Sequence, residues 1–349
     1  MSFSNENREH IKAKIIEAIG TSKDFKPQAF AKEHSVSVTT VYRYLKQLEK
    51  EDRITSRKDG RKNEYRLTDE FHCFTFKLSE IKEDIVWNES IAPHLKNMPE
   101  TALRNCNYAF TEMLNNAIDH SGGTHVEISL QNNSFRTIIL IKDNGVGIFS
   151  KIAEALKLEE KRFAVLELAK GKFTTDPKSH TGEGIFFSSK ATYLFTIFSD
   201  DLMFMPLDLS GYKADSVLHD HKTSYSSEGT FILFIILHSH KQTLQEVFDK
   251  YAGAPEDYGF AKTVVPVKLL EYGDDSALYT SRSQAKRLLI RFEKFEHIEL
   301  DFTDIQEIGQ GFADEIFRVF ANQHPEISLI ATNCSEQVQF MIKRAKSSQ

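Results

Sequence analysis

Hydrophobic and polar positions divide the first 68 residues into three helices and a hairpin. Apolar residues recur at helical spacing in three segments, at 8–19, 27–34 and 39–48. The third segment follows the capping candidates Ser37 and Thr39 and has one apolar face, while its other sides are basic. Two strand-like runs then occupy 54–67 around the turn signal Asp59-Gly60. This pattern predicts a small, mainly helical domain that ends in a basic hairpin.

The rest of the chain alternates strands and helices, as α/β proteins do. After a connecting segment at 69–100, apolar strand-like runs at 138–141 and 231–237 alternate with helices that begin near Phe110 and after His180. From 261 to 346, strand-like and helical runs alternate again, which predicts a separate small α/β domain. We therefore expect a multidomain α/β protein whose three domains lie at 1–68, 69–245 and 255–349.

Length, charge and cysteine usage narrow the class of protein. A chain of 349 residues exceeds the usual size of one hydrophobic core. Its net charge of −6 hides a split, +5 for residues 1–68 and −11 for 69–349, which places the basic surface near the N-terminus. Three scattered cysteines indicate neither a disulfide framework nor a zinc site. No apolar run approaches the roughly 20 residues that span a bilayer, and the polar start lacks a signal-peptide core, so we expect a cytoplasmic protein without membrane contact.

Helix, helix, basic helix and basic hairpin, in this order, resemble a winged helix-turn-helix domain over about residues 7–68. The resemblance implies binding of double-stranded DNA, with the third helix in the major groove and the hairpin on phosphate. The candidate DNA-binding residues are Thr39, Thr40, Tyr42, Arg43, Lys46, Arg57, Lys58, Arg61 and Lys62. Two alternatives stay open: a helical module with a solvated charged face, and a protein-docking module, since winged helices also bind proteins.

Three separated segments give the strongest chemical signal. In 110–121, Glu112, Asn116 and Asp119 are spaced i, i+4 and i+7, so they share one face of a helix. The second segment is the DxGxG loop at 143–147, which follows an apolar run. The third, His180-Thr-Gly-Glu-Gly, opens a helix. Each segment alone is weak evidence, because glycine-rich turns often only bend the backbone.

In this order and spacing the three segments resemble the ATP-binding domain shared by gyrase, a heat-shock chaperone, sensor histidine kinases and mismatch-repair ATPases, the GHKL superfamily. The resemblance covers about residues 75–240. It implies an α/β sandwich with a mixed sheet and helices on one face, and it implies ATP and Mg²⁺ as cofactors. A homodimer stays open, because nucleotide-bound GHKL domains often dimerise.

The resemblance also implies roles for single residues. Asn116 matches the asparagine that coordinates Mg²⁺, and Glu112 matches the carboxylate that polarises the attacking nucleophile. Asp143 matches the aspartate that binds the adenine amino group. Without the resemblance, Glu112 is interpreted as a salt-bridged surface glutamate and Asp143 as a turn cap. The other cofactor-binding candidates are Asp119, Gly145, Gly147, Lys172, His180, Thr181, Gly182, Gly184 and Thr230.

The glycines and the polar segment at 170–179 are interpreted through the same resemblance. Gly145 and Gly147 are expected to let the backbone pass close to the nucleotide, where a Cβ would obstruct it. Gly182 and Gly184 match hinge glycines beside a lid that binds phosphate. The polar segment between Lys170 and Ser179 is expected to be this lid, with Lys172, Lys178 and His180 as phosphate contacts. Thr230 matches the threonine of a water network around adenine.

The segment from His297 to Phe317 resembles the STAS fold of anti-sigma-factor antagonists, in its STAS-like variant. The phosphoacceptor serine of that family would fall near Gln310 or Gly311, where no Ser or Thr is present. Thr303 is only a distant substitute. Phosphorylation of this domain by its neighbour is therefore doubtful, and binding of a protein partner stays open.

Together the resemblances imply an ATP-binding, DNA-binding transcriptional regulator, in which Mg-ATP at the GHKL site switches the binding of DNA or of a protein partner. The alternative is an anti-sigma-factor-type serine kinase that acts on a separate partner, with Glu112 as base. A sensor histidine kinase is disfavoured, because the upstream region shows no long acceptor helix. Whether ATP is hydrolysed, as by a weak ATPase, or transferred stays open.

Overall fold

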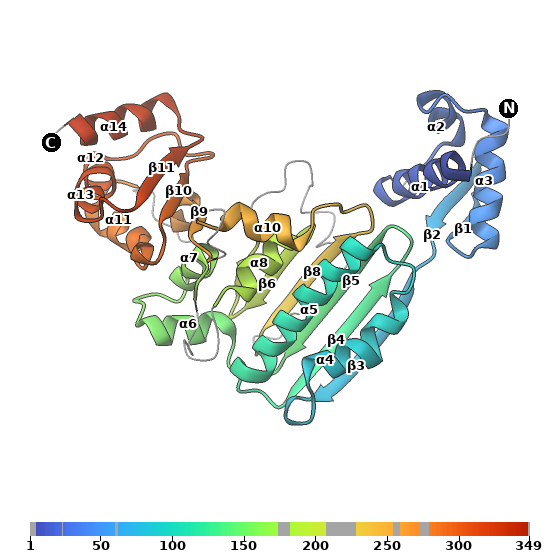
Figure 1. Ribbon diagram of the computed structural model, residues 1–349, viewed down its shortest axis with the longest axis horizontal. Coiled ribbons are helices and arrows are strands. Elements are labelled where there is room, and N and C mark those ends of the chain that lie inside the picture. Colours follow the sequence, from blue (N-terminus) through green and yellow to red (C-terminus); the bar gives the residue numbers. More distant parts are fainter. Residues whose placement is uncertain are drawn as a thin grey trace.

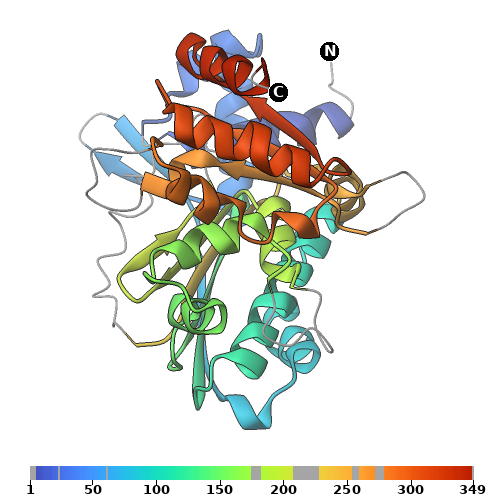
Figure 2. The ribbon, with the colours of Figure 1, turned by 90° about the vertical axis from the view of Figure 1, so that its left-hand side faces the viewer.

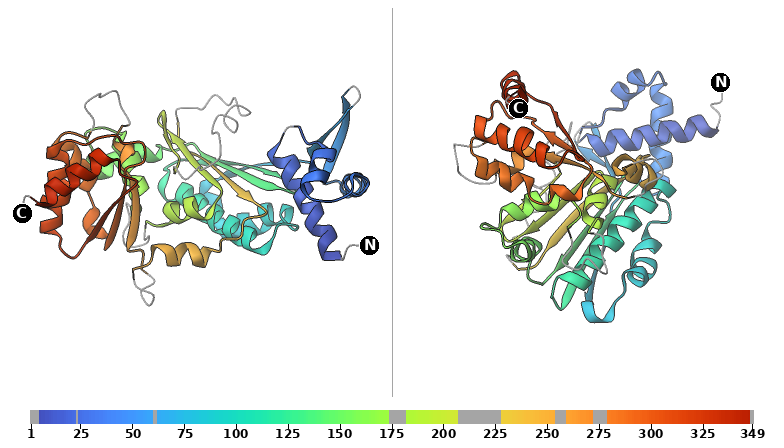
Figure 3. Two further views of the ribbon diagram at one scale, coloured as in Figure 1. Left: turned by 90° about the horizontal axis from the view of Figure 1, so that it is seen from above. Right: turned by 60° about the vertical axis from the view of Figure 1, so that its left-hand side comes forward.

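The structure, a computed structural model, describes residues 5–22, 24–59, 62–173, 182–206, 228–253, 259–271 and 279–347. Three parts follow one another along the long axis, with the N-terminal helices at one end and the C-terminal part at the other (Figure 1, Figure 3). Within these ranges no helix combines the length and the apolarity that crossing a bilayer requires. The arrangement is that of a multidomain α/β chain.

Three helices and one hairpin form the N-terminal part. The elements are α1 (Asn5–Thr21), α2 (Pro27–Glu33), α3 (Val38–Lys50), β1 (Ile54–Asp59) and β2 (Lys62–Leu67). Ser37 caps α3, because its hydroxyl accepts a hydrogen bond from the Thr40 N–H at 3.1 Å. A separate apolar core, which includes Ile15, Tyr44 and Leu48, holds these elements together.

A six-stranded sheet in the order β3-β4-β5-β8-β6-β7 forms the centre of the molecule. Its strands are β3 (Glu70–Lys77), β4 (His125–Asn132), β5 (Arg136–Asp143), β6 (Leu194–Ser199), β7 (Leu202–Phe204) and β8 (Phe231–Leu237). The segment expected to connect two domains therefore contributes the edge strand β3.

The expectation of a mixed central sheet is wrong for the described strands, because every pairing among them is antiparallel. β5 and β6, which are joined through helices, do run in the same direction. However, β8 lies between them and pairs antiparallel with both. Strand–helix alternation in the sequence fixes the direction of two strands, but it does not reveal that a later strand inserts between them.

Helices cover one face of this sheet (Figure 1). They are α4 (Glu83–Val86), α5 (Glu100–His120), α6 (Ile148–Leu156), α7 (Phe163–Lys170), α8 (Gly184–Ala191) and α10 (Leu244–Tyr251), with short turns at Leu78–Glu80, Trp87–Ile91 and Ala92–His94. α5 packs on β5, β8 and α8. On α10, Phe248 and Tyr251 contact the rings of Phe187 and Phe186, so the apolar core continues past residue 245.

The C-terminal part is a three-stranded parallel sheet with helices, seen nearest the viewer in Figure 2. Its strands are β9 (Lys262–Pro266), β10 (His297–Asp301) and β11 (Ser328–Thr332). Its helices are α11 (Arg282–Leu289), α12 (Gln310–Asp314), α13 (Ala321–Gln323) and α14 (Glu336–Ser347), with short turns at Val267–Glu271, Phe292–Lys294 and Glu315–Phe320. Phe260 contacts Phe186 on one side and Phe295 on the other, so this part and the central part share one core.

Candidate functional site

A cavity of about 300 Å³ lies between α5, α6, α8 and the sheet. Seven residues singled out from the sequence line it: Glu112, Asn116, Asp143, Gly147, Gly182, Gly184 and Thr230. They come from three segments of the chain and from Thr230, the residue just before β8. Most of the remaining wall is apolar, with Ile141, Ile148, Ile152 and Phe186 among its side chains. Polar groups at a few points of an apolar cavity are typical of small-molecule sites.

Helix α5 brings Glu112 and Asn116 to the cavity, one turn apart on the same face. The Nδ2 atom of Asn116 is buried and has no hydrogen-bond partner among the described residues. The Glu112 carboxylate lies against Gly184, because a Cβ at position 184 would clash with its Oε2 atom. Asp119, at the end of the same helix, is exposed and does not line the cavity.

Asp143, the last residue of β5, places a buried carboxylate in the cavity wall. Its Oδ1 atom accepts hydrogen bonds from the backbone N–H groups of Gly145, at 2.8 Å, and Thr230, at 3.3 Å. Burial raises the pKa of this carboxyl, and the two N–H groups oppose that shift by stabilising the charged form. Both of these backbone hydrogen bonds are accepted by Oδ1, and the Thr230 hydroxyl also helps to lower the pKa.

Thr230 connects the Asp143 loop to the start of α6. Its backbone oxygen accepts the Asp143 N–H at 3.0 Å, and its hydroxyl accepts the Ile148 N–H at 3.1 Å. Position 147, just before α6, needs glycine because its φ is +83° and a Cβ would meet Ser199 and Asp200. Contacts within the protein therefore fix the conformation of the loop from Asp143 to Gly147.

Besides Asp119 and Gly145, which do not line the cavity, three further candidate cofactor-binding residues lie elsewhere or outside the described residues. The Lys172 ammonium donates to the Lys294 carbonyl at 2.9 Å and lies over the rings of Phe260 and Phe295, so it is not in the cavity wall. His180 and Thr181, with most of the expected lid, including Lys178, lie outside the described residues.

Sequence reasoning missed a different lysine. Lys151, on α6, lines the cavity, and its Nζ donates to the His120 carbonyl at the end of α5 at 2.6 Å. Its position in the sequence could have revealed it, because Lys151 lies one helical turn after Gly147. It shares a face of α6 with Ile148 and Ile152, which also line the cavity. A cation at the C-terminus of a helix is electrostatically favoured.

The candidate DNA-binding residues gather on α3 and the hairpin. Thr39, Tyr42, Arg43, Lys46, Arg57 and Lys58 are exposed, and Thr40 is half-buried beside Ser37. The Arg43 guanidinium lies 5.0 Å from the centre of the Tyr44 ring. Arg61 and the side chain of Lys62 lie outside the described part of the hairpin.

In the C-terminal part, an ion-pair network lies around Asp314, one helical turn after Gln310. Asp314 accepts from Arg318 and from Arg282, at 2.6 and 3.3 Å, and the Arg318 guanidinium holds the pKa of that carboxyl below its usual range. Thr303 is exposed and donates its hydroxyl hydrogen to Asp301 at 2.7 Å.

The C-terminal part contains a STAS-like domain. Residues 284–339 match the model of a family described as a STAS-like domain of unknown function (DUF4325). This agrees with the resemblance found in the sequence from His297 to Phe317. The match covers a minority of the chain and concerns the C-terminal domain alone. No curated protein matches the chain.

Proposed function

We propose that the central cavity is a GHKL-type site for an adenine nucleotide with Mg²⁺, and that the N-terminal part is a winged helix that binds double-stranded DNA. The protein is then a transcriptional regulator whose DNA or partner binding depends on the nucleotide. The observation that carries the proposal is the convergence of three distant segments, through Glu112, Asn116, Asp143 and Gly184, on one cavity.

Asp143 is suited to recognise the adenine amino group. Its Oδ1 atom is engaged by two backbone N–H groups, and its Oδ2 atom can accept a hydrogen bond from a ligand. Fixed acceptors in an apolar wall give specificity, because a ligand without the matching donor leaves the acceptor unpaired. The surrounding isoleucines provide the apolar surface that a base requires.

Asn116 and Glu112 fit a magnesium-bound phosphate chain. Asn116 has a buried amide without a partner on Nδ2, and the opposite amide orientation would present its oxygen at the same place. Such an oxygen is a ligand type that Mg²⁺ accepts beside phosphate oxygens. When bound, the metal neutralises phosphate charge. Glu112, beside Gly184, is placed to accept a proton from a nucleophile.

Calorimetric titration of the full chain with ATP and Mg²⁺ tests the nucleotide site. Asp143→Asn keeps the size of the side chain but replaces an acceptor by a donor, so we expect the affinity to fall roughly tenfold to a hundredfold. Asp84→Asn, which changes an exposed carboxylate on α4, is the matched control and should bind like the wild type. Equal affinities of all three proteins, or no binding by the wild type, would refute the nucleotide site.

The second candidate, an anti-sigma-factor-type serine kinase, is favoured by the place of Glu112 in the cavity wall. Incubation with γ-labelled ATP and cell extract separates the two functions. A kinase transfers the label to a partner protein, and the transfer disappears in Glu112→Gln. A nucleotide-dependent switch releases free phosphate or leaves ATP intact.

A further inference from the structure

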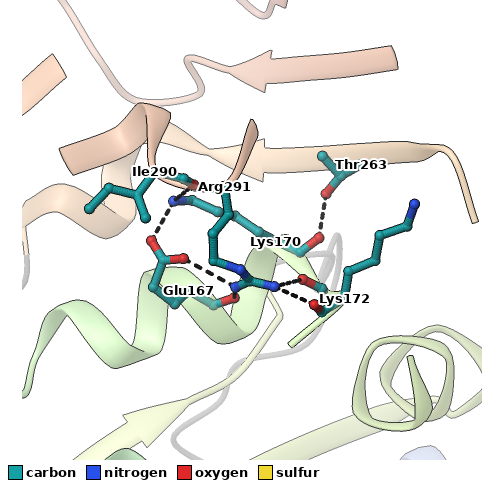
Figure 4. Close-up of polar contacts among 7 residues, drawn as sticks. Glu167, Lys170, Lys172, Thr263, Ile290 and Arg291 are labelled. Carbon is teal, nitrogen blue, oxygen red and sulfur yellow. Dashed lines mark hydrogen bonds and ion pairs between the residues drawn. The ribbon is translucent and has the colours of Figure 1, made fainter. Parts of the chain in front are cut away.

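A buried ion-pair cluster lies where α7 meets the STAS-like domain (Figure 4). Glu167, Lys170 and Arg291 expose only 1%, 0% and 7% of their surfaces. The Lys170 ammonium bonds to the Glu167 carboxylate and to the Ile290 carbonyl, and Arg291 Nη1 lies 3.2 Å from Glu167 Oε2. Buried charges cost folding free energy unless they are paired and hydrogen-bonded, as they are here.

Arg291 also holds the chain that follows α7. Its Nη2 donates to the carbonyls of Gly171, at 2.9 Å, and of Lys172. Its guanidinium carbon lies 5.3 Å from the centre of the Phe173 ring. Thr263 of β9 adds a hydrogen bond to the Lys170 carbonyl at 2.8 Å. Four consecutive residues, 170–173, are thus contacted from the C-terminal side.

The same residues form part of the cavity. Gly171 and Phe173 line it, and the Phe173 N–H donates to the carbonyl of Gly182, another lining residue, at 3.1 Å. The backbone here needs support, because Gly171 and Lys172 have φ values of +80° and +52°. A non-glycine residue in the left-handed region carries backbone strain. Such a conformation persists only where surrounding contacts impose it.

We propose that Arg291 is a positioning residue for the cavity: the STAS-like domain supplies it to hold the wall at Gly171–Phe173, so ligand affinity depends on a residue outside the central part. That the ligand is a nucleotide rests on the function proposed above. The positioning of the wall does not depend on that function. By linkage, a cavity ligand and the docking of the STAS-like domain stabilise one another.

Arg291 can be replaced by a neutral residue without leaving an unpaired buried charge. Its removal leaves Glu167 and Lys170 as a hydrogen-bonded pair of opposite charge, so no lone buried charge results. Arg287 provides a matched control, since its Nη2 donates to Glu159 at 2.8 Å and its guanidinium lies over Phe163. It therefore also joins the STAS-like domain to the central part, but it does not touch residues 170–173.

Hydrogen exchange without nucleotide tests the positioning role on the full chain. In Arg291→Met, we expect the amides of Gly171 and Phe173 to exchange about tenfold faster than in the wild type, because local opening becomes easier. Arg287→Met should leave both rates unchanged. Arg291→Lys, which restores a charge beside Glu167 but cannot bridge two carbonyls as an arginine does, should give an intermediate rate. Wild-type exchange in Arg291→Met and Arg291→Lys, or equal acceleration in Arg287→Met, would overturn the proposal.

Titration of the same proteins with Mg-ATP tests the coupling to the ligand. We expect Arg291→Met to bind at least about fivefold more weakly and Arg287→Met to bind as the wild type does. Faster exchange with unchanged ATP affinity would overturn the coupling. If the wild type binds no ATP, the proposed function fails, and the exchange comparison alone decides the role of Arg291.

Discussion

Gly145 lies where the loop after β5 crosses the end of α5. A Cβ at this position would clash with the backbone carbonyl of Ser121, which itself accepts the Val146 N–H at 2.9 Å. The sequence-based explanation for this glycine was close approach of a nucleotide. The structure gives a reason within the protein, since two backbone segments meet here without room for a side chain. Gly145 therefore shapes the cavity through its neighbours.

Substitution of Gly145 by alanine is expected to destabilise the protein by about 1–3 kcal/mol, because the Ser121 backbone must move to admit the methyl group. The midpoint of thermal unfolding should fall accordingly. Gly122→Ala is the control: its φ is +66°, but the nearest atom to an added Cβ is 4.0 Å away. It should cost only the backbone strain of about 1 kcal/mol. Equal losses in the two variants would contradict this explanation.

Among the elements, periodicity predicted α1, α3 and β8 well, because each has an apolar face or run of sufficient length. Helix α5 was expected only around Phe110 and the residues after it, whereas it begins at Glu100. The six-stranded order was not accessible, since it depends on where β8 inserts. β3 was also missed, although its alternating burial is that of a half-buried edge strand. Strand pairing is a long-range property that local patterns do not contain.

The same limit applies to the candidate site. Residues fixed by short motifs, such as Asp143 and Gly184, do line the cavity. Lys172 was chosen for its charge near a glycine-rich segment, yet its ammonium is held by the Lys294 carbonyl of the C-terminal part. Lys151 reaches the cavity from a helix that no motif contains. A motif predicts backbone geometry, whereas the position of a long flexible side chain depends on the tertiary contacts it finds.

The N-terminal part contacts the central sheet at the turn between β4 and β5, close to the end of β8. Arg53 donates to the Ser134 hydroxyl at 3.1 Å, and Phe135 packs against the N-terminal core. His238 lies at the same junction, where its backbone N–H donates a hydrogen bond to the Phe135 carbonyl at 2.9 Å. Burial, together with the nearby charge of Arg53, lowers the pKa of His238 to about 4.

This histidine makes the stability of the chain dependent on pH. Between about pH 6.5 and pH 4 the unfolded chain binds a proton at position 238 and the folded chain does not, so stability is lost as the pH falls. The loss is at most about 1.4 kcal/mol per pH unit, and less because the side chain is only partly buried. Urea denaturation at pH 7, 6 and 5 should show wild type losing more stability than His238→Gln. Parallel losses would contradict the assignment, because the loss would then not come from position 238.

At the scale of the whole molecule, the two junctions differ. The central part and the STAS-like domain share one apolar core and the buried Glu167–Lys170–Arg291 cluster. The N-terminal part keeps a core of its own and meets the central sheet through Phe135 and Arg53. Strand β5 begins beside this second junction and ends at Asp143, in the cavity wall. A single strand therefore connects the proposed nucleotide site with the proposed DNA-binding part.

The proposed role of the N-terminal part leads to a prediction about DNA binding. The full chain should bind duplex DNA with an affinity that falls as salt rises, because lysines and arginines displace counterions from phosphate. Changing both Arg43 and Arg57 to alanine should weaken binding by about tenfold or more and reduce the salt slope by about two. Lys14→Ala is the matched control, because Lys14 lies on α1 and not on α3 or the hairpin. Its ammonium is already paired with the carboxylate of Glu17, on the same helix, at 3.0 Å. Fluorescence anisotropy at several salt concentrations measures both quantities.

The nucleotide dependence of the same titration tests the whole arrangement. A non-hydrolysable ATP analogue should change the DNA affinity of the wild type and leave that of Asp143→Asn unchanged, because a ligand shifts an equilibrium only by its differential affinity for the two states. A salt-dependent DNA affinity that no nucleotide alters would retain the winged helix and refute the switch. Loss of the salt dependence would instead favour a protein-docking role, since electrostatic contact with phosphate is what the exposed cations of α3 and β1 offer.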